Sequence, residues 1–363
     1  MNAQSNRLVS VLAIVAGLVM LFSLVEHYWP IGPDYYYHYR PLADEWVSGS
    51  WRLYGDDQVY LVYPPWSALF IAPLGLMSLD AGKAALFLLT TICIVASLRL
   101  IYGRWRVPRW VLFVSLANLY TLDALLRGQL DTVALFGMVS AWWAARNNHP
   151  WILSIALCVA TVKPPANIVL PLLAILFELR HWSIGNIARV ATFPLLCIAG
   201  SFVVFGLTWP VEFLQNLQGP INYLSISLWR AGNLLGIPST WIGAMCTVLV
   251  LLVLYEILHS PLNLRALSIA IAANLLVTPY ANGDYYVLLI PAFAYVAARN
   301  WKWSVLAYAF SFTPLLRTVF GYDAAVADLF FPVILLACSW FLPDRTAQDH
   351  ASPSKGTARS AMV

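Results

Sequence analysis

The sequence predicts an all-α polytopic membrane protein with about twelve spans, and its composition and apolar pattern carry that prediction. Hydrophobic residues make up 61% of the 363 residues and charged residues only 10%, against about 25% in an ordinary soluble domain. Apolar runs long enough to cross a bilayer recur from Leu8 to Leu342. The polar breaks between these runs leave no room for a soluble domain. Lipid is therefore the expected solvent for most of the protein surface.

The distribution of positive charge predicts the topology. If the apolar run from Pro64 to Leu79 crossed the membrane, the basic cluster between Arg99 and Arg109 would lie outside, against the positive-inside rule. We therefore expect that run to form a juxtamembrane or re-entrant helix. The first apolar run lacks a small-residue cleavage pattern, so we expect an uncleaved span rather than a signal peptide. The expected spans are residues 8–25, 84–101, 109–123, 129–146, 150–162, 165–180, 188–206, 237–257, 265–280, 284–299, 302–317 and 324–342.

This arrangement forms a single domain, residues 1–343, in the cell (cytoplasmic) membrane with both termini in the cytoplasm. Residues 26–83, with juxtamembrane helices, and residues 207–236 form extracytoplasmic loops. A polar tail, residues 344–363, is expected to be disordered and cytoplasmic. Most of the 21 basic residues then lie inside. Those expected outside are Arg40, Arg52, Lys83, Arg127, Lys163, Arg230 and Arg317.

Several classes of function are disfavoured by composition. The net charge of +4 is scattered and no basic run of the kind that binds nucleic acid is present. The five cysteines lie in apolar stretches without CxxC spacing, which disfavours a disulfide framework or a zinc site. The acidic pairs Asp44-Glu45 and Asp56-Asp57 indicate a divalent metal only weakly, because solvated acidic loops are common. We expect no cofactor.

A carboxylate follows the first span closely, in the sequence Gly32-Pro33-Asp34-Tyr35-Tyr36. At the membrane boundary Asp34 could act as a general base toward an incoming hydroxyl. The alternative is an interfacial tyrosine belt in which Asp34 caps a helix that starts at Tyr35. In isolation this segment favours the alternative. The segment Tyr63-Pro64-Pro65 is equally ambiguous, because prolines also simply start helices.

Four cations recur at the outer ends of predicted spans, on the side that the positive-inside rule disfavours: Arg127, Lys163, Arg230 and Arg317. Charged groups near a membrane are costly and usually paired, so a shared anionic ligand such as a lipid phosphate would explain all four. The alternative for any one of them is that its side chain reaches to the interface water. Lys163 stands out because Pro164 and Pro165 stop its helix and free backbone groups there.

Taken in order, these segments resemble the GT-C class of membrane glycosyltransferases and, within it, glycosyltransferase family 87. That family includes polyprenyl-phosphate-mannose-dependent mannosyltransferases and related arabinofuranosyltransferases. The resemblance rests on Asp34-Tyr35-Tyr36, Tyr63-Pro64-Pro65, Arg127-Gly128-Gln129, Lys163-Pro164 and the amide-rich stretch from Asn216 to Asn233.

The resemblance implies a GT-C-like architecture and an extracytoplasmic active site in the cell envelope. It implies a polyprenyl-phosphate sugar donor, a glycolipid or glycan acceptor, and Asp34 as the base of a single inverting displacement. Lys163, Arg127, Arg230 and Arg317 would then bind the donor phosphate. By the same resemblance, the residues that would contact sugar or acceptor are Tyr35, Tyr36, Tyr63, Gln129 and Asn233.

Two other readings of the sequence stay open. A transporter or lipid flippase would suit twelve spans equally well, although acids such as Asp131 and Asp284 lie near span ends and not near the midplane where ion relays usually sit. A non-catalytic scaffold that binds lipid would explain the hydrophobicity but not the displaced cations.

Overall fold

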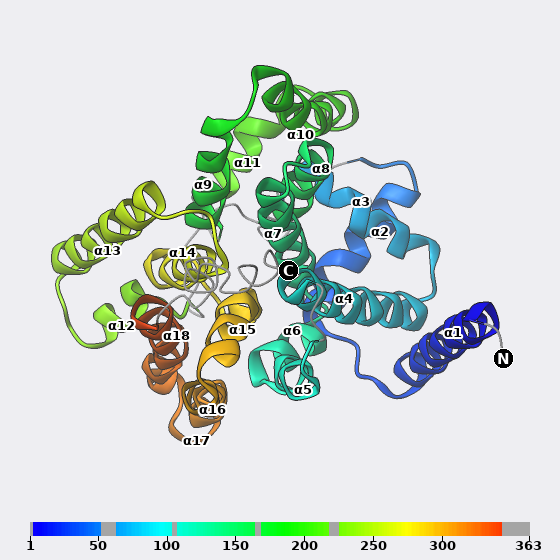
Figure 1. Ribbon diagram of the computed structural model, residues 1–363. Coiled ribbons are helices and arrows are strands. Elements are labelled where there is room, and N and C mark those ends of the chain that lie inside the picture. The colour runs from blue at the N-terminus through cyan, green and yellow to red at the C-terminus, as the bar shows by residue number, and fades with distance from the viewer. Residues whose placement is uncertain (1–2, 52–62, 104–106, 164–167, 218–224, 343–363) are drawn as a thin grey trace, which may run out of the picture.

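The computed structural model describes residues 3–51, 63–103, 107–163, 168–217 and 225–342 (Figure 1). Every regular element within these ranges is helical, as predicted. The expectations for Arg52, Asp56, Asp57, the Pro164-Pro165 sequence and the tail lie outside the described residues.

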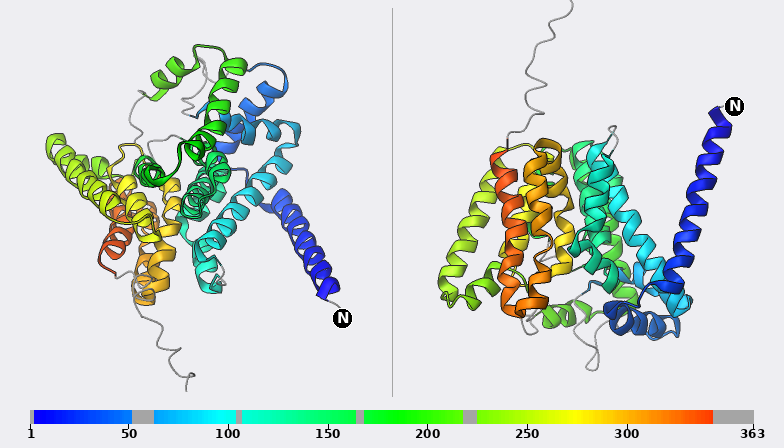
Figure 2. Two further views of the ribbon diagram at one scale, coloured as in Figure 1. Left: turned by 45° about the horizontal axis from the view of Figure 1, so that its top comes forward. Right: turned by 90° about the horizontal axis from the view of Figure 1, so that it is seen from below.

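The helices run between two ends of the molecule, as the right-hand view of Figure 2 shows. The start of α1 (Ala3–Tyr28) and the end of α18 (Phe330–Phe341) lie at one end. The short helices α2 (Arg40–Val47) and α11 (Trp209–Leu217) lie at the other, which we call the loop end. The helix α1 stands apart from the bundle and packs beside α4 (Figure 1).

Three helices are each long and apolar enough to cross a membrane: α4 (Leu79–Tyr102), α10 (Ile184–Phe205) and α13 (Ser239–His259). A fourth crossing is made if α5 (Arg109–Ala117) and α6 (Leu119–Arg127), bent by 57° at Asn118, count together. By length and composition the described residues thus contain three or four spans, so twelve stays a prediction. The shorter helices of the bundle are α7 (Asp131–Arg146), α8 (Pro150–Ala160), α9 (Val169–Glu178), α14 (Leu264–Val277), α15 (Ile290–Arg299), α16 (Trp301–Phe310) and α17 (Pro314–Phe320).

Several predicted spans are not continuous helices. The span expected at 284–299 consists of a 3₁₀ segment, η6 (Gly283–Leu289), followed by α15. The span expected at 302–317 breaks between α16 and α17, and the one at 324–342 begins with a second 3₁₀ segment, η7 (Tyr322–Leu329). Prolines at the starts of α15 and α17 explain two of these breaks, because proline lacks the N–H that would continue the preceding turn.

The first loop folds into short helices that pack on one another. The described part contains a π-helical turn, η1 (Tyr35–Tyr39), then α2. The apolar run from Pro64 onward forms η2 (Pro65–Ser67), α3 (Ala68–Ile71) and η3 (Ala72–Leu76). Arg40 connects the two parts by donating to the carbonyls of Leu74 and Met77, at 3.2 and 2.7 Å.

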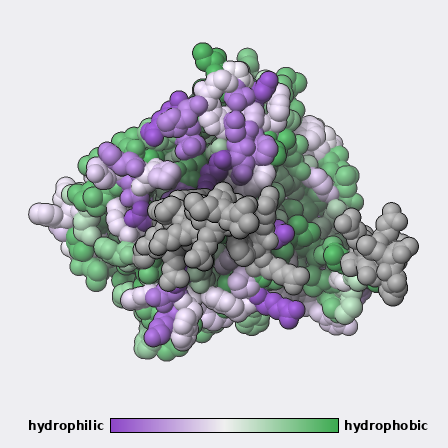
Figure 3. Space-filling view, in the orientation of Figure 1, coloured by the Kyte–Doolittle hydropathy of each residue, from purple (hydrophilic) through white to green (hydrophobic). Residues whose placement is uncertain are grey.

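The core lies where α7 crosses its neighbours. Most of α7 is buried, and Gly137 sits so close to α8 that a Cβ atom would overlap the backbone of Val159 and Ala160. By contrast, α10 and α13 expose large apolar side chains, with Val203 86% and Leu251 60% accessible. Figure 3 shows one face of the molecule, in the orientation of Figure 1: hydrophilic residues gather in patches on this face and hydrophobic residues form much of its rim. This distribution is that of a membrane protein.

Candidate active site

Asp34 is held at the loop end by two glycines. A Cβ atom on Gly32 would overlap the backbone carbonyls of Leu126 and Arg127, so only glycine lets this segment lie on the end of α6. Gly128 ends α6 in the left-handed conformation, with φ +75°, and its α-carbon faces Tyr35. The segment after the first helix is therefore fixed against the residues that follow α6, 95 positions away in sequence from Asp34 to Gln129.

The side chain of Asp34 faces a mixed polar environment and is 18% exposed. Its Oδ2 accepts a hydrogen bond from Gln129 Nε2 and lies 3.9 Å from Arg127 Nη1. Its Oδ1 lies 3.8 Å from His38 Nε2. Although Asp34 immediately precedes η1, its side chain makes no capping hydrogen bond there. The helix-cap alternative considered for this residue is therefore wrong.

Lys163 is buried beneath Gln129, only 4% exposed. Its ammonium donates to Gln129 Oε1, to Asp131 Oδ2 at 2.8 Å and to Asp284 Oδ2 at 3.5 Å. The ring of Tyr285 lies 4.6 Å from the ammonium. Since an ammonium has three N–H donors, all three are engaged in this arrangement. Lys163 and Asp34 thus belong to one network, joined through Gln129.

Two tyrosines extend this network. Tyr39 donates to Gln129 Oε1 at 3.1 Å, and the hydroxyls of Tyr39 and Tyr63 are 2.8 Å apart. Burial raises the pKa of Tyr39, and it raises the pKa of Tyr63 to about 12. Both hydroxyls therefore keep their protons at neutral pH. Since the proton of Tyr39 is given to Gln129, Tyr63 is the donor between the two.

Arg127 is the more accessible cation, with 37% of its side chain exposed. Its Nε donates to Asp123 at 2.9 Å, one helical turn back on α6. This ion pair holds the side chain but leaves part of the guanidinium free. Arg127 therefore combines positive charge, accessibility and proximity to Asp34.

A second buried cluster lies close by. Arg317 pairs with the fully buried Asp328, which also accepts a hydrogen bond from Tyr120 at 3.1 Å. A Cβ atom on Gly283 would lie 3.6 Å from Arg317 Nη2. Because Gly283 precedes Asp284, this contact brings Arg317 to the edge of the Lys163 network.

The remaining predicted residues lie in different surroundings. Tyr35 is 1% exposed and its hydroxyl points at Gly82 of α4. Tyr36 is 48% exposed and packs edge-on against Tyr37. Arg230, on α12 (Leu228–Leu234), is partly buried and has no ionic partner among the described residues. Asn233 is exposed. The structure therefore brings Asp34, Tyr63, Arg127, Gln129 and Lys163 together, and places the others around or away from them.

Sequence reasoning missed the acidic partners of the cations. The sequence places Asp131 and Asp284 near span ends but does not identify them as the partners of Lys163. It likewise does not identify Asp328 as the partner of Arg317. Their signal was present, because each buried cation needs an opposite charge and few acids are available at that side. Within the described residues no group of three or more His, Cys, Asp or Glu side chains is arranged to hold a metal ion.

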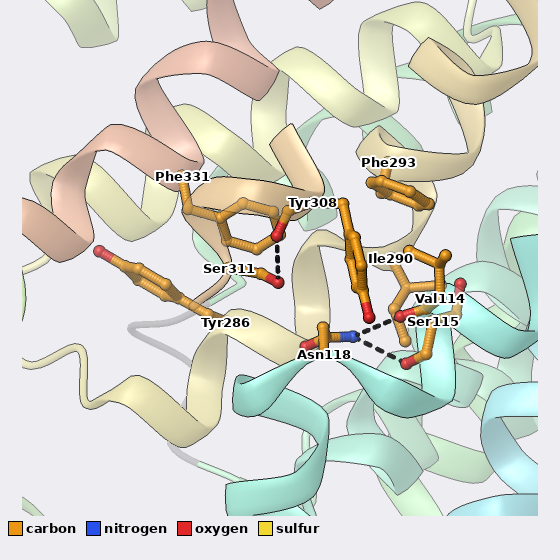
Figure 4. A pocket seen from close by; sticks show the side chains of 9 residues that line it. All are labelled: Val114, Ser115, Asn118, Tyr286, Ile290, Phe293, Tyr308, Ser311 and Phe331. Carbon is orange, nitrogen blue, oxygen red and sulfur yellow. Dashed lines mark hydrogen bonds between the residues drawn. The ribbon is translucent and has the colours of Figure 1, made fainter. Parts of the chain in front are cut away.

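A small pocket lies next to the second cluster, between α5, α15, α16 and α18 (Figure 4). Tyr286 and Phe331 line it, and both rings pack on Tyr120 at 4.9 and 5.3 Å. Asn118, at the bend between α5 and α6, and Ser311 provide polar edges. None of the lining residues is charged, so the pocket offers apolar surface beside a charged site.

A family comparison decides the class of this protein. The model of glycosyltransferase family 87 matches residues 60–281, more than half of the chain. The chain belongs to glycosyltransferase family 87. The matched range includes Arg127, Gln129 and Lys163, whereas Asp34 and Arg317 lie outside it. No curated protein and no solved structure shows significant similarity to the chain. Membership of family 87 makes this membrane protein a glycosyltransferase, as the resemblance predicted.

Proposed function

We propose that the protein transfers a sugar, a mannose-like hexose or arabinofuranose, from a polyprenyl-phosphate donor to a hydroxyl of a glycolipid or glycan acceptor. The observation that carries this proposal is the pairing of an accessible carboxylate with an accessible guanidinium: Asp34 Oδ2 and Arg127 Nη1 are 3.9 Å apart. One side chain can accept a proton and the other can bind a phosphate.

The proposed reaction is a single displacement. Asp34 takes the proton of the acceptor hydroxyl, and the oxygen of that hydroxyl forms a bond to the anomeric carbon. The bond between the anomeric carbon and the phosphate oxygen breaks, and its electron pair leaves with polyprenyl phosphate. Attack opposite to the leaving group inverts the anomeric configuration. No metal or cofactor is required by these steps.

Arg127 is proposed as the principal ligand of the leaving phosphate, since developing negative charge is best stabilised by a preorganised cation. Arg317 and Arg230 would extend this positive surface. Lys163 differs from them, because its three N–H groups already face Gln129, Asp131 and Asp284. We therefore propose that it organises the site and does not bind the phosphate directly.

We propose that this site is extracytoplasmic, in the cell (cytoplasmic) membrane. Basic residues at the ends of helices opposite the loop end support this orientation, because such residues concentrate on the cytoplasmic side. Those among the described residues are Arg99, Arg109, Arg146, Arg180, Arg189, Arg265, Arg299 and Lys302.

The direct test uses purified protein in proteoliposomes with a radiolabelled polyprenyl-phosphate sugar and a glycolipid extract as acceptor. We expect labelled acceptor and free polyprenyl phosphate in equal amounts, with the opposite anomeric configuration in the product. Movement of the labelled lipid across the bilayer without sugar transfer would instead identify a transporter or flippase and contradict the proposal.

Gly32→Ala tests whether the position of Asp34 matters. The added methyl group would push the Asp34 segment away from the end of α6, so we expect sugar transfer to fall by about 100-fold, as a displacement of about 1 Å can cause. Gly185→Ala is the matched control, since nothing lies within 4 Å of its Cβ position. Equal transfer rates in the two variants would show that the contact is unimportant.

A further inference from the structure

The orientation of the Gln129 amide follows from its partners. Lys163 has only N–H donors and no acceptor, so the Gln129 atom that faces it must be the oxygen. Tyr39 donates to the same oxygen at 3.1 Å. The amide nitrogen is therefore directed to Asp34, whose carboxylate can only accept. Gln129 is 6% exposed, so its own amide is largely shielded from water.

The elements behind Gln129 keep this orientation fixed. Lys163 is held by Asp131 from the start of α7 and by Asp284 from η6. Reversing the amide would place two N–H donors against the ammonium and an oxygen against the Asp34 carboxylate. Both contacts would be repulsive in a site of low polarity. The buried ion network therefore determines which group Gln129 presents to Asp34.

The two oxygens of Asp34 are thereby made different. Oδ2 accepts from Gln129 and faces Arg127, whereas Oδ1 accepts no hydrogen bond from the described residues. The charged or titratable groups near this carboxylate are Arg127, His38 and Tyr63, with Lys163 behind Gln129. Oδ1 is thus the oxygen free to receive a proton.

We propose that Gln129 is a positioning residue of the transfer reaction, which orients the Asp34 carboxylate so that Oδ1 accepts the proton of the acceptor hydroxyl. This inference rests on the proposed function, and it assigns Gln129 a role toward the base and not toward the sugar. Lys163 and Tyr39 act through Gln129.

Gln129→Glu tests this role, because it keeps the shape of the side chain but replaces the N–H donor with a second carboxyl group. Two carboxyl groups would then lie in contact, and such a pair retains a shared proton to higher pH than a single carboxyl group does. We expect the acid limb of the pH profile of kcat/KM to move up by about one pH unit or more. At pH 7 kcat should fall by about 10-fold or more, with little change in the KM for the donor. Gln215→Glu, on the exposed face of α11 at the same end, is the matched control and should keep the wild-type profile.

Gln129→Asn provides a second variant without new charge. Its amide is shorter by one methylene group, so we expect a lower kcat with the acid limb unmoved. If Gln129→Glu does not fold, an unchanged kcat in Gln129→Asn overturns the inference. A raised KM with wild-type kcat and pH profile in either variant also overturns it and makes Gln129 a substrate ligand.

Asp34→Asn measured in parallel separates the two proposals. If wild-type protein transfers sugar, Asp34→Asn does not, and Gln129→Glu keeps the wild-type pH profile, only the role of Gln129 is wrong. If Asp34→Asn is fully active, Asp34 is not the base, and the role of Gln129 is lost with it. If wild-type protein transfers no sugar from any polyprenyl-phosphate donor, the proposed function itself fails.

Discussion

Asp34→Asn is expected to lower sugar transfer by about 10²–10⁴-fold, the contribution typical of a general base, and in practice to abolish it. The amide has the shape of the carboxylate but cannot take the proton of the acceptor. Asp34 lies in a partly exposed segment and does not cap a helix, so the variant should fold and still bind donor lipid. Transfer of radiolabelled sugar, donor binding and thermal unfolding together check this result.

Asp44→Asn is the matched control for that experiment. Asp44 lies in the same loop, is 49% exposed and pairs with Arg40 at 2.9 Å, away from the Gln129 network. Asp44 and Glu45 are also carboxylates of the first loop. We expect Asp44→Asn to keep most of the activity. Full activity in Asp34→Asn with loss in Asp44→Asn would exchange the two roles.

Lys163→Met should have the largest effect on stability. It removes the cation that pairs with both Asp131 and Asp284, and both acids are almost fully buried. Breaking a buried ion pair by removing one partner costs about 3–5 kcal/mol, because the remaining charge is left uncompensated. We expect a markedly lower apparent Tm in detergent and a poor yield of folded protein.

Lys302→Met is the control for this loss, because Lys302 is exposed at the other end of the molecule and the same substitution there should change the apparent Tm little. The double variant Lys163→Met with Asp131→Asn should recover part of the stability, because it removes one of the uncompensated charges. If Lys163→Met melts at the same temperature as Lys302→Met, the buried network does not hold the fold together.

Several expected spans are not continuous helices near the loop end, and one of these breaks, at η6, forms part of the candidate site. A continuous α-helix satisfies its own backbone groups, so it offers few of them to neighbouring side chains. In η6, the change from 3₁₀ to α geometry places Asp284, Tyr285 and Tyr286 in successive positions that are all buried. Hydropathy did not predict this change, because the residues on both sides of the break are equally apolar.

The sequence alone determined the class of the molecule. Its apolar composition predicted a helical membrane protein, since the free energy of transfer to lipid depends on the residue types in a run and not on their neighbours in space. The cations on the disfavoured side, with Asp34 after the first span, marked the end of the molecule where we propose that the site lies. The family assignment, which covers Arg127, Gln129 and Lys163, could also be predicted from the motifs in the chain.

Only the tertiary structure decided which charges meet. Asp34, Gln129, Lys163 and Asp284 come from four separate segments, and their contacts depend on how each helix is rotated and where it ends. The structure separated Tyr35, which packs on Gly82, from Tyr63, which joins the network. It also showed that Lys163, which we expected to bind a phosphate, is neutralised by Asp131 and Asp284. A buried charge needs a partner of opposite charge, and the packing of the helices determines which residue that partner is.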